Sequence, residues 1–414
     1  MQKGTAASPN TPSRPGIRLA PPRRERAGTT IPPKILLYSH DTFGLGNIRR
    51  TLLLAETLRH AHPGAAILLI TGSPVIQSFR IPAGVDYVKL PCLDRTDADV
   101  YAPRFIARDR EIADLRRAIL AQSLLSFAPD LVVVDKRPSG IGGELADALE
   151  LLDRLPRKPA MVLGLRDILD EPSRTRASLA ATGAMDLIER YYDEVWVYGE
   201  RAIFDAVAEY EFSPAVAART RYCGYLRRPV EPRSAPAAAP RVLVTPGGGG
   251  DGRALITAYL EDLATLPRSV ALHTTVVFGP EMPAEERQAF RGRFGALADV
   301  DFVDFELDMN RRYANADVAV TMAGYNTVCE LLSFGLPAVL VPRTRPVREQ
   351  WLRASALARE GLVAMVEPDG LEPGRLMAAV RDRLAQARSA PSLDMNGLPR
   401  ILDRVRDLLG VRES

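Results

Sequence analysis

The sequence predicts an α/β fold in which two Rossmann-like domains turn their parallel sheets toward each other across a cleft. Apolar, strand-like runs alternate with amphipathic helical segments along most of the 414 residues. The alternation stops once, at 227–240, and then begins again with a second strand and a glycine-rich loop. Alternating strands and helices build βαβ units and therefore a parallel sheet. The length also favours two domains over one.

The first half reads as a complete parallel sheet with its crossover helices. Its predicted strands are 34–38, 65–74, 86–91, 130–136, 160–167 and 193–199, and its predicted helices are 47–61, 108–129 and 142–155. The centre of the run 130–136, residues 131–134, is entirely apolar, which is typical of a strand buried on both faces. We therefore expect this strand to belong to a parallel sheet that is covered on both faces.

The second half repeats the pattern after a linker that is rich in proline and alanine and has no period. Its predicted strands are 241–245, 273–280, 300–305, 316–324 and 336–342, with helices between them and a terminal amphipathic helix at 398–414. The predicted division is a tail at 1–33, an N-terminal domain at 34–228, a linker at 229–240, a C-terminal domain at 241–385 and a helical segment at 386–414. Ligands of open α/β sheets bind outside the carboxyl ends of the strands, so the predicted cleft is the expected site.

The net charge of +3 hides an uneven distribution. Residues 1–33 carry six basic side chains against Glu25, a net charge of +5, so the remaining residues carry −2. A nearly neutral body argues against a nucleic-acid-binding protein. The tail is rich in Pro, Ser, Thr and Arg, which is typical of disorder. We interpret it as a solvated extension, with weak peripheral contact to anionic lipid as the alternative.

Composition also argues against membrane-spanning and secreted proteins. No stretch approaches the ~18 uninterrupted apolar residues of a membrane-spanning helix, and the N-terminus lacks the apolar core of a secretory signal. Cys92, Cys223 and Cys329 lie far apart, which argues against a disulfide framework or a zinc site. We expect a cytoplasmic protein, located at the inner face of the membrane if the tail binds lipid.

The stretch TPGGGGDGR, Thr245 to Arg253, holds four consecutive glycines: Gly247, Gly248, Gly249 and Gly250. Such a run costs backbone entropy, and it suits a loop whose amides meet a phosphate. The helix that follows adds the positive end of its dipole. Because no G-K-[ST] follows, the loop is not a Walker P-loop. A merely flexible loop is the alternative.

A second signal lies where a strand ends at Gly324 and a helix opens at Asn326 and Thr327. Spacings of three and four residues put Glu330 on the same helix face as these two side chains. A carboxylate there can accept hydrogen bonds from both vicinal hydroxyls of a ribose. The alternative is a first-turn glutamate that stabilises the helix dipole.

The stretch YSHDTFGLGNIRR, Tyr38 to Arg50, follows the first strand. Gly44 and Gly46 predict a strand-to-helix turn, but Arg49 stands where a G-x-G-x-x-G dinucleotide motif needs its third glycine. We interpret Gly44, Gly46 and Asn47 as an acceptor-side loop that faces the cleft.

These residues carry a resemblance to a known family. Ala316–Ala354 resembles the donor-nucleotide region of glycosyltransferase family 28, the MurG-like enzymes, whose pattern runs S/A-G-x-x-T-x-x-E, then G-x-P-x-x-x-V-P, then Q. Here the matching residues are Ala323 to Glu330, Gly335 to Pro342 and Gln350. The segments YSHDTFGLGNIRR, VVVDKRPSGIGGEL and LGLRDILDEP further resemble a subgroup of predicted, uncharacterised glycosyltransferases, over nearly all of 34–385. The resemblance implies a two-domain GT-B fold.

The resemblance also implies roles for individual residues. Glu330 would hold the ribose, Gln350 would contact the donor sugar, and Arg227, in CGYLR, would meet the diphosphate at the domain junction. The residues expected beside the diphosphate, the sugar and the base are Gly247–Gly250, Gly324–Thr327 and Phe305–Met309. No cofactor is implied, because the nucleotide sugar is a substrate.

Two positions depart from the family pattern. Asn47 stands where the family has a histidine, and Glu349 stands where members often have glutamine. Asparagine cannot take a proton at neutral pH, so the general base has to come from elsewhere. His40 and Asp41, at the end of the first strand, are the first candidates. Asp135 and Asp167, each at the end of a later strand, are the second.

The expected reaction is transfer of a hexose or N-acetylhexosamine from a nucleotide-diphospho-sugar, UDP-linked in the first instance, to a saccharide, lipid-linked or small-molecule acceptor. Glycine-loop amides, a helix N-terminus and Arg227 can stabilise the leaving diphosphate without a metal. Direct attack from the acceptor side would invert the anomeric centre. Two alternatives stay open: a sugar-nucleotide epimerase of the same architecture, and a nucleotide-sugar-binding protein that has lost catalysis.

Overall fold

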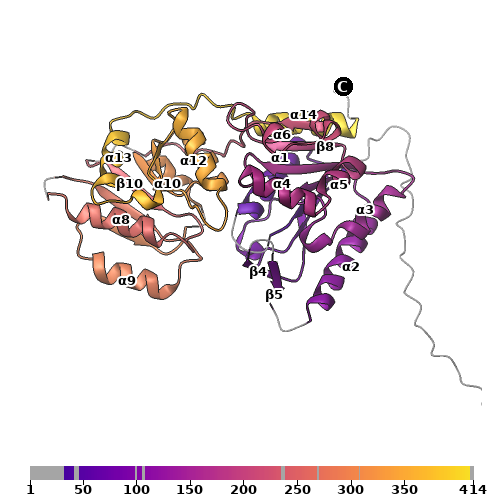
Figure 1. The fold of residues 1–414 in the computed structure, drawn as a ribbon, viewed down its shortest axis with the longest axis horizontal. Coiled ribbons are helices and arrows are strands. Elements are labelled where there is room, and N and C mark those ends of the chain that lie inside the picture. Colours follow the sequence, from indigo (N-terminus) through magenta and orange to yellow (C-terminus); the bar gives the residue numbers. More distant parts are fainter. Residues whose placement is uncertain are drawn as a thin grey trace, which may run out of the picture.

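The computed structural model describes residues 32–41, 46–97, 100–104, 108–234, 238–267, 270–306 and 308–410. Most of the predicted basic tail and Gly44 of the predicted acceptor-side loop lie outside these ranges. The chain forms two α/β bodies that lie next to each other (Figure 1). Both sheets are parallel, which confirms the predicted fold class.

The first sheet has seven parallel strands in the order β3-β2-β1-β6-β7-β8-β9. They are β1 (Lys34–Ser39), β2 (Ala66–Thr71), β3 (Val85–Lys89), β6 (Leu131–Asp135), β7 (Ala160–Arg166), β8 (Glu194–Tyr198) and β9 (Thr220–Tyr222). Every residue of β6 is buried, as its apolar sequence predicts. The chain builds outward from β1 through β3 and then returns to place β6 on the other side of β1. The strand order therefore reverses between β1 and β6, and ligands of open sheets bind at such a reversal.

The helices of this N-terminal body are α1 (Gly46–Ala61), α2 (Asp109–Phe127), α3 (Ala146–Asp153), α4 (Pro172–Ala181), α5 (Ala184–Tyr191), α6 (Ala206–Glu209) and α7 (Pro214–Arg219). Single turns of 3-10 helix lie at Ile76–Ser78 and Ile141–Gly143. A hairpin of β4 (Leu93–Asp97) and β5 (Val100–Pro103) projects beside the sheet. The predicted helix at 142–155 begins later, at Ala146, because Gly142 and Gly143 have φ values of 56° and 77°, which no α-helix accepts.

The second sheet has six parallel strands in the order β12-β11-β10-β13-β14-β15. They are β10 (Arg241–Thr245), β11 (His273–Val277), β12 (Val300–Val303), β13 (Val318–Thr321), β14 (Ala338–Leu340) and β15 (Ala364–Met365). The helices of this C-terminal body are α8 (Arg253–Ala264), α9 (Ala284–Phe294), α10 (Asn310–Asn315), α11 (Tyr325–Phe334), α12 (Glu349–Arg359) and α13 (Arg375–Leu384), with a 3-10 turn at Pro368–Gly370. Here the strand order reverses between β10 and β13. The glycine-rich loop follows β10, and α11 follows β13, so both sequence signals lie at this reversal.

Asp262 connects two helices of the C-terminal body. It lies near the end of α8 and is 5% exposed. Its carboxylate accepts hydrogen bonds from the backbone N–H groups of Gly374, at 2.5 Å, and Met377, at 3.0 Å. These donors belong to the start of α13, where the first N–H groups have no partner within the helix. A side chain from another helix thus caps α13.

The last helix, α14 (Gly397–Leu409), packs on the N-terminal body, although it follows the C-terminal body in sequence (Figure 1). Ile401 and Val405 are buried in the same apolar cluster as the core face of α1. The two segments that connect the bodies are hydrogen-bonded to each other. Tyr225 N donates to Asp394 O at 2.8 Å, and Gly397 N donates to Tyr225 O at 3.1 Å. The bodies are therefore joined by two adjacent crossings.

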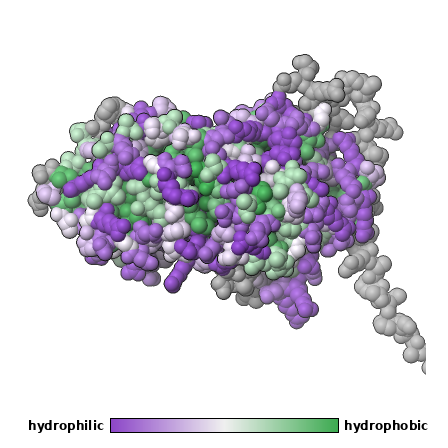
Figure 2. Space-filling view, turned by 45° about the horizontal axis from the view of Figure 1, so that its top comes forward, coloured by the Kyte–Doolittle hydropathy of each residue, from purple (hydrophilic) through white to green (hydrophobic). Residues whose placement is uncertain are grey.

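Within the described ranges, no helix combines the length and apolar character needed to span a bilayer. Hydrophilic and hydrophobic residues are interspersed on the face drawn in Figure 2. The boundaries of the predicted domains and linker stay a prediction, although residues 227–234 and 238–240 contain neither helix nor strand.

Candidate functional site

A cavity of about 460 Å³ lies between the two bodies. Its lining comes from the ends of strands and the starts of helices at both strand-order reversals. Of the predicted site residues, the lining includes His40, Gly46, Asn47, Gly247, Gly248, Gly324, Asn326, Thr327 and Gln350. Among those the structure describes, Asp41, Arg227, Gly249, Gly250 and Glu330 do not line it.

His40 and Asp135 meet at the reversal of the first sheet, because one follows β1 and the other ends the adjacent strand β6. His40 Nδ1 lies 3.3 Å from Asp135 Oδ2, close enough for an ion pair but without an aligned hydrogen bond. Asp135 Oδ1 accepts from Arg50 Nη2 at 2.5 Å and from Arg50 Nε at 3.2 Å. Asn47 links the same groups, since its Oδ1 accepts from Arg50 at 3.1 Å and its Nδ2 lies 3.3 Å from His40 Nε2.

Burial sets the charge of this cluster. His40 is 5% exposed, and burial lowers its pKa to about 4 even though Asp135 acts in the opposite direction. For Asp135, burial raises the pKa, but the charge of Arg50 and the interaction with the His40 ring outweigh it, and the pKa falls below its usual range. At neutral pH the cluster therefore holds a neutral imidazole beside a carboxylate. With the amide of Asn47 directed at Nε2, the proton on the imidazole belongs on Nδ1, facing Asp135.

Asp41, the other first-choice base candidate, is buried in the N-terminal body and does not line the cavity. It is 1% exposed and accepts hydrogen bonds from the Ser39 hydroxyl, from Thr71 Oγ1 at 3.1 Å and from Ile48 N at 3.0 Å. Ile48 is in the first turn of α1, so Asp41 caps that helix. Burial raises the pKa of Asp41 to about 6. The structure therefore brings His40 to the cavity and turns Asp41 into the fold.

The glycine-rich loop has backbone angles that only glycine adopts readily. Gly247 and Gly249 have φ values of 82° and 100°, in a region that L side chains rarely adopt. The carboxylate of Glu281 lies over the loop, because a Cβ added to Gly248 would be 2.9 Å from Glu281 Oε2. Burial and the nearby charge of Asp251 raise the pKa of Glu281. Only part of the loop, Gly247 and Gly248, lines the cavity.

The first turns of α1 and α11 face each other across the two bodies. Asn326 Nδ2 donates to Gly46 O at 2.7 Å, and Asn326 Oδ1 accepts from Arg228 Nη2 at 2.7 Å. Glu330 Oε1 forms an ion pair with Arg49 Nη2. Two helix N-termini, each carrying a partial positive charge, therefore converge on one end of the cavity.

Arg228, rather than the predicted Arg227, lies at the junction of the two bodies. Arg227 is exposed, whereas Arg228 is 8% exposed and bonds Asn326. The chain is extended here, and Leu226 pairs with Asn396 in an antiparallel bridge. Successive side chains of an extended chain point to opposite sides, so a one-residue difference moves the guanidinium from solvent to the interior.

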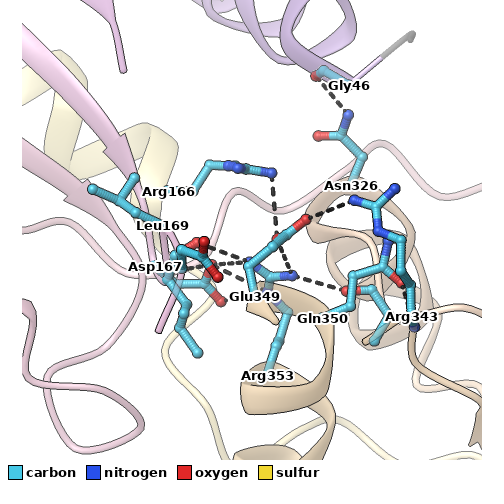
Figure 3. Close-up of polar contacts among 12 residues, drawn as sticks. Gly46, Arg166, Asp167, Leu169, Asn326, Arg343, Glu349, Gln350 and Arg353 are labelled. Atoms are coloured by element: carbon cyan, nitrogen blue, oxygen red, sulfur yellow. Dashed lines mark hydrogen bonds and ion pairs between the residues drawn. The ribbon is translucent and has the colours of Figure 1, made fainter. Parts of the chain in front are cut away.

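Glu349 also lines the cavity and lies among three arginines (Figure 3). Its carboxylate is 2.9 Å from Arg353 Nη1 and 3.4 Å from both Arg166 Nη1 and Arg343 Nη2. Burial alone would raise the pKa of Glu349, but the three guanidinium charges have the larger effect and lower it to about 2. The neighbouring Gln350 accepts from the Arg343 backbone N–H at 3.3 Å.

Asp167, a second-choice base candidate, is bound by Arg353 and is 2% exposed. It is therefore not free to take a proton from a substrate. Among the described residues, no group of three or more His, Cys, Asp and Glu side chains could hold a metal ion.

Sequence reasoning missed the arginines that complete the site: Arg49, Arg50, Arg166, Arg228, Arg343 and Arg353. A helical spacing was readable for two of them, because Arg50 follows Asn47 by three residues and Arg353 follows Glu349 by four. Their partners across the sheets and bodies leave no trace in a single sequence.

Comparison with known proteins gives the family. The model of the glycosyltransferase family 28 C-terminal domain matches residues 241–402. A UDP-N-acetylglucosamine--N-acetylmuramyl-(pentapeptide) pyrophosphoryl-undecaprenol N-acetylglucosamine transferase from Halorhodospira halophila is 33% identical over 287 residues, 66% of this chain and 68% of the relative. The enzyme of the same name from Glaesserella parasuis is 29% identical over 157 residues, and that match spans only 43% of its length and 38% of this chain.

Solved structures show the same architecture. MurG of Acinetobacter baumannii superposes with a TM-score of 0.56 at 17% identity, covering 91% of this chain and all of that one. A putative UDP-N-acetylglucosamine 2-epimerase from Listeria monocytogenes gives a TM-score of 0.59 at 13% identity, covering 92% and 97%. At these identities the likeness shows the fold alone. Together with the match to the Halorhodospira relative, these findings show that the chain has the GT-B fold and belongs to glycosyltransferase family 28.

Proposed function

We propose that this protein transfers a hexose or N-acetylhexosamine from a UDP-linked donor to an acceptor hydroxyl, with inversion and without a metal ion. One observation carries the proposal: the cavity joins the His40–Asp135 pair on one body to the first turn of α11 on the other. The proposed base and the proposed diphosphate site would face each other there, as a displacement at an anomeric carbon requires.

The donor nucleotide is proposed to bind the C-terminal body. The N-terminus of α11 offers backbone N–H groups and a partial positive charge to the diphosphate, with Thr327 and Gly247 beside it. Arg228 adds a buried guanidinium from the junction. Glu330 would accept hydrogen bonds from the ribose hydroxyls, and Gln350 would contact the sugar.

His40 is the proposed general base. Once the acceptor hydroxyl replaces the Asn47 amide at His40 Nε2, the acceptor oxygen would bond to the anomeric carbon as its proton passes to Nε2, and the bond to the diphosphate oxygen would break with its electron pair. Asp135 would stabilise the imidazolium that forms, and Asn47 would orient the ring. A pKa near 4 keeps the imidazole unprotonated at neutral pH, so it can accept the proton.

Charge on the leaving diphosphate would be stabilised by the helix N-terminus and by arginines already in place. This supports the proposal that no divalent metal is needed, and magnesium should leave donor affinity unchanged. The acceptor would enter from the N-terminal body, where Lys136, Arg137, Arg166 and Arg174 line the cavity.

A saccharide, a lipid-linked sugar or a small molecule can supply the acceptor hydroxyl. The named relatives act on a pyrophosphoryl-undecaprenol acceptor. We propose a cytoplasmic location, with weak contact to the inner membrane face through the basic tail.

Calorimetric titration with UDP, dTDP, GDP, ADP and NAD, with and without magnesium, tests the donor site. Magnesium-independent binding of one pyrimidine diphosphate supports the proposal, and binding of NAD alone, or of none, overturns it. Donor turnover then separates the alternatives. Conversion of the sugar nucleotide without any acceptor would indicate an epimerase, and tight binding without turnover across an acceptor panel would indicate a binding protein.

A further inference from the structure

The two carboxylate oxygens of Glu330 have different surroundings. Oε1 is paired with Arg49, which belongs to the opposite body, in the first turn of α1. Oε2 is buried, in a residue that is 3% exposed, and forms no hydrogen bond of good geometry, although the Tyr313 hydroxyl interacts with the carboxylate. A buried carboxylate oxygen without a protein partner is costly, and a water molecule, an ion or a ligand normally satisfies such an atom.

Arg49 is the more accessible partner in this pair. Its side chain is 26% exposed against 4% for Glu330, and it lines the cavity. Because Arg49 reaches Glu330 from the cavity side, a ligand that takes both carboxylate oxygens has to displace its guanidinium. The two vicinal hydroxyls of a ribose are such a ligand.

A second guanidinium group, that of Arg228, lies close to the Arg49–Glu330 pair. Arg228 lies beside the pair and is held by neutral groups, Asn326 Oδ1 at 2.7 Å and the Arg49 carbonyl at 3.4 Å. Two guanidinium groups therefore lie beside the buried carboxylate of Glu330, and the exposed carboxylate of Asp308 also acts on Arg49. If Arg49 were displaced from Glu330, its guanidinium would lie next to that of Arg228 without a buried carboxylate partner. An anion bound there would stabilise both guanidinium groups.

On the basis of the proposed function, we propose that Arg49 exchanges partners when the donor binds. It neutralises Glu330 while the site is empty, and it pairs with the donor diphosphate once the ribose hydroxyls occupy Glu330. Arg49 would thus be a donor-site residue supplied by the N-terminal body. Because it stands on the first turn of α1, two residues from Asn47, its movement would link donor binding to the loop that carries the acceptor side.

The exchange makes opposite predictions for a nucleoside and for its diphosphate. In Arg49→Gln, uridine no longer has to displace a competing cation, so it should bind about two- to five-fold more tightly, the worth of a partly exposed ion pair. UDP loses a charge-assisted contact and should bind about tenfold or more weakly. Arg49→Lys keeps a cation and should change UDP affinity by less than Arg49→Gln does. Arg59→Gln, in the last turn of the same helix, is the matched control and should change neither affinity.

Calorimetry with uridine and UDP on these variants tests the proposal. Equal weakening of both ligands would overturn it and make Arg49 a structural residue, and an unchanged UDP affinity would overturn it as well. The tighter uridine binding should vanish when Arg49→Gln is made in a Glu330→Gln background, because there is then no ion pair to break. If the wild-type protein binds none of the nucleotides in the panel, the donor-site assignment fails and this proposal fails with it. If the wild-type protein binds UDP but Arg49→Gln does not strengthen uridine binding while weakening UDP binding, the partner exchange fails and the donor site stands.

Discussion

Arg353 in α12 holds Asp167, which follows β7 in the other body, through two guanidinium nitrogens. Nε lies 2.8 Å from Oδ2 and Nη2 lies 2.7 Å from Oδ1, and the two side chains are 0% and 2% exposed. Burying two charges costs desolvation energy that only the partner and the surrounding hydrogen bonds offset. The pair therefore fastens the bodies together only while both members are present.

Asp167→Asn should destabilise the protein by about 3 kcal/mol or more, because it leaves the buried charge of Arg353 incompletely compensated. Urea unfolding measures this directly. Arg359→Ala, at the exposed end of the same helix, is the control and should change the free energy of unfolding by less than about 0.5 kcal/mol. An equally small change in Asp167→Asn would show that the pair contributes little to joining the bodies.

The pKa of His40 can be measured separately from its neighbours. The chain has four histidines, and one of them should titrate near pH 4 in an NMR pH series, with His40→Gln assigning the signal. A His40 signal that titrates near its ordinary value of 6.5 would show that the imidazole is more hydrated than the structure indicates.

The same shift predicts the sign of a stability change. Because the folded pKa of His40 lies below 6.5, its contribution to stability is complete above that pH and is lost as pH falls toward 4. Asp41 acts in the opposite sense, since its folded pKa is raised from 3.8 to about 6 and its contribution is lost as pH rises through that range. The two slopes oppose each other, so the difference in stability between wild type and His40→Gln, rather than the wild-type curve alone, should show the histidine's part.

His40→Ala should lower kcat by roughly 10²- to 10⁴-fold with little change in the affinity for UDP, because a general base acts on the acceptor proton. Asp41→Asn should instead destabilise the fold, since Asp41 accepts three hydrogen bonds and caps α1. Initial rates and thermal unfolding of the two variants separate these roles. Full activity in His40→Ala would remove it as the base.

Glu330→Ala should weaken the binding of a nucleoside diphosphate by about 1.5–3 kcal/mol, the range for a hydrogen bond to a charged group. Calorimetry on the variant gives this value, with Glu360→Ala as an exposed control. An unchanged affinity would show that the ribose lies elsewhere.

Asp262→Ala should lower the free energy of unfolding by about 1–2 kcal/mol, because it removes the cap of α13. Glu261→Ala is the matched control, since that neighbour forms only a surface ion pair with Arg293. Equal effects of the two changes would contradict the capping role.

Much of this fold was readable because hydrophobic periodicity is local. The apolar residues 131–134 predicted the buried strand β6, and the glycines after β10 predicted a loop, although the positive φ values of Gly247 and Gly249 came only from the structure. The hairpin of β4 and β5 was missed, because its charged sequence lacks a strand period. Arg228 was missed for a different reason: only the direction of an extended chain decides which of two adjacent arginines is buried. His40 was singled out by its place after a strand, but its partner Asp135 became evident only when β1 and β6 lay next to each other.

The position of α14 has a consequence for how the protein is made. Ile401 and Val405 complete the apolar core beside α1. The N-terminal body leaves the ribosome first, but it cannot complete its core until α14 has been translated. Until residues 397–409 emerge, the nascent N-terminal body exposes the surface that they cover. Truncation just after the second sheet would therefore destabilise the N-terminal body, whose folding depends on residues 397–409.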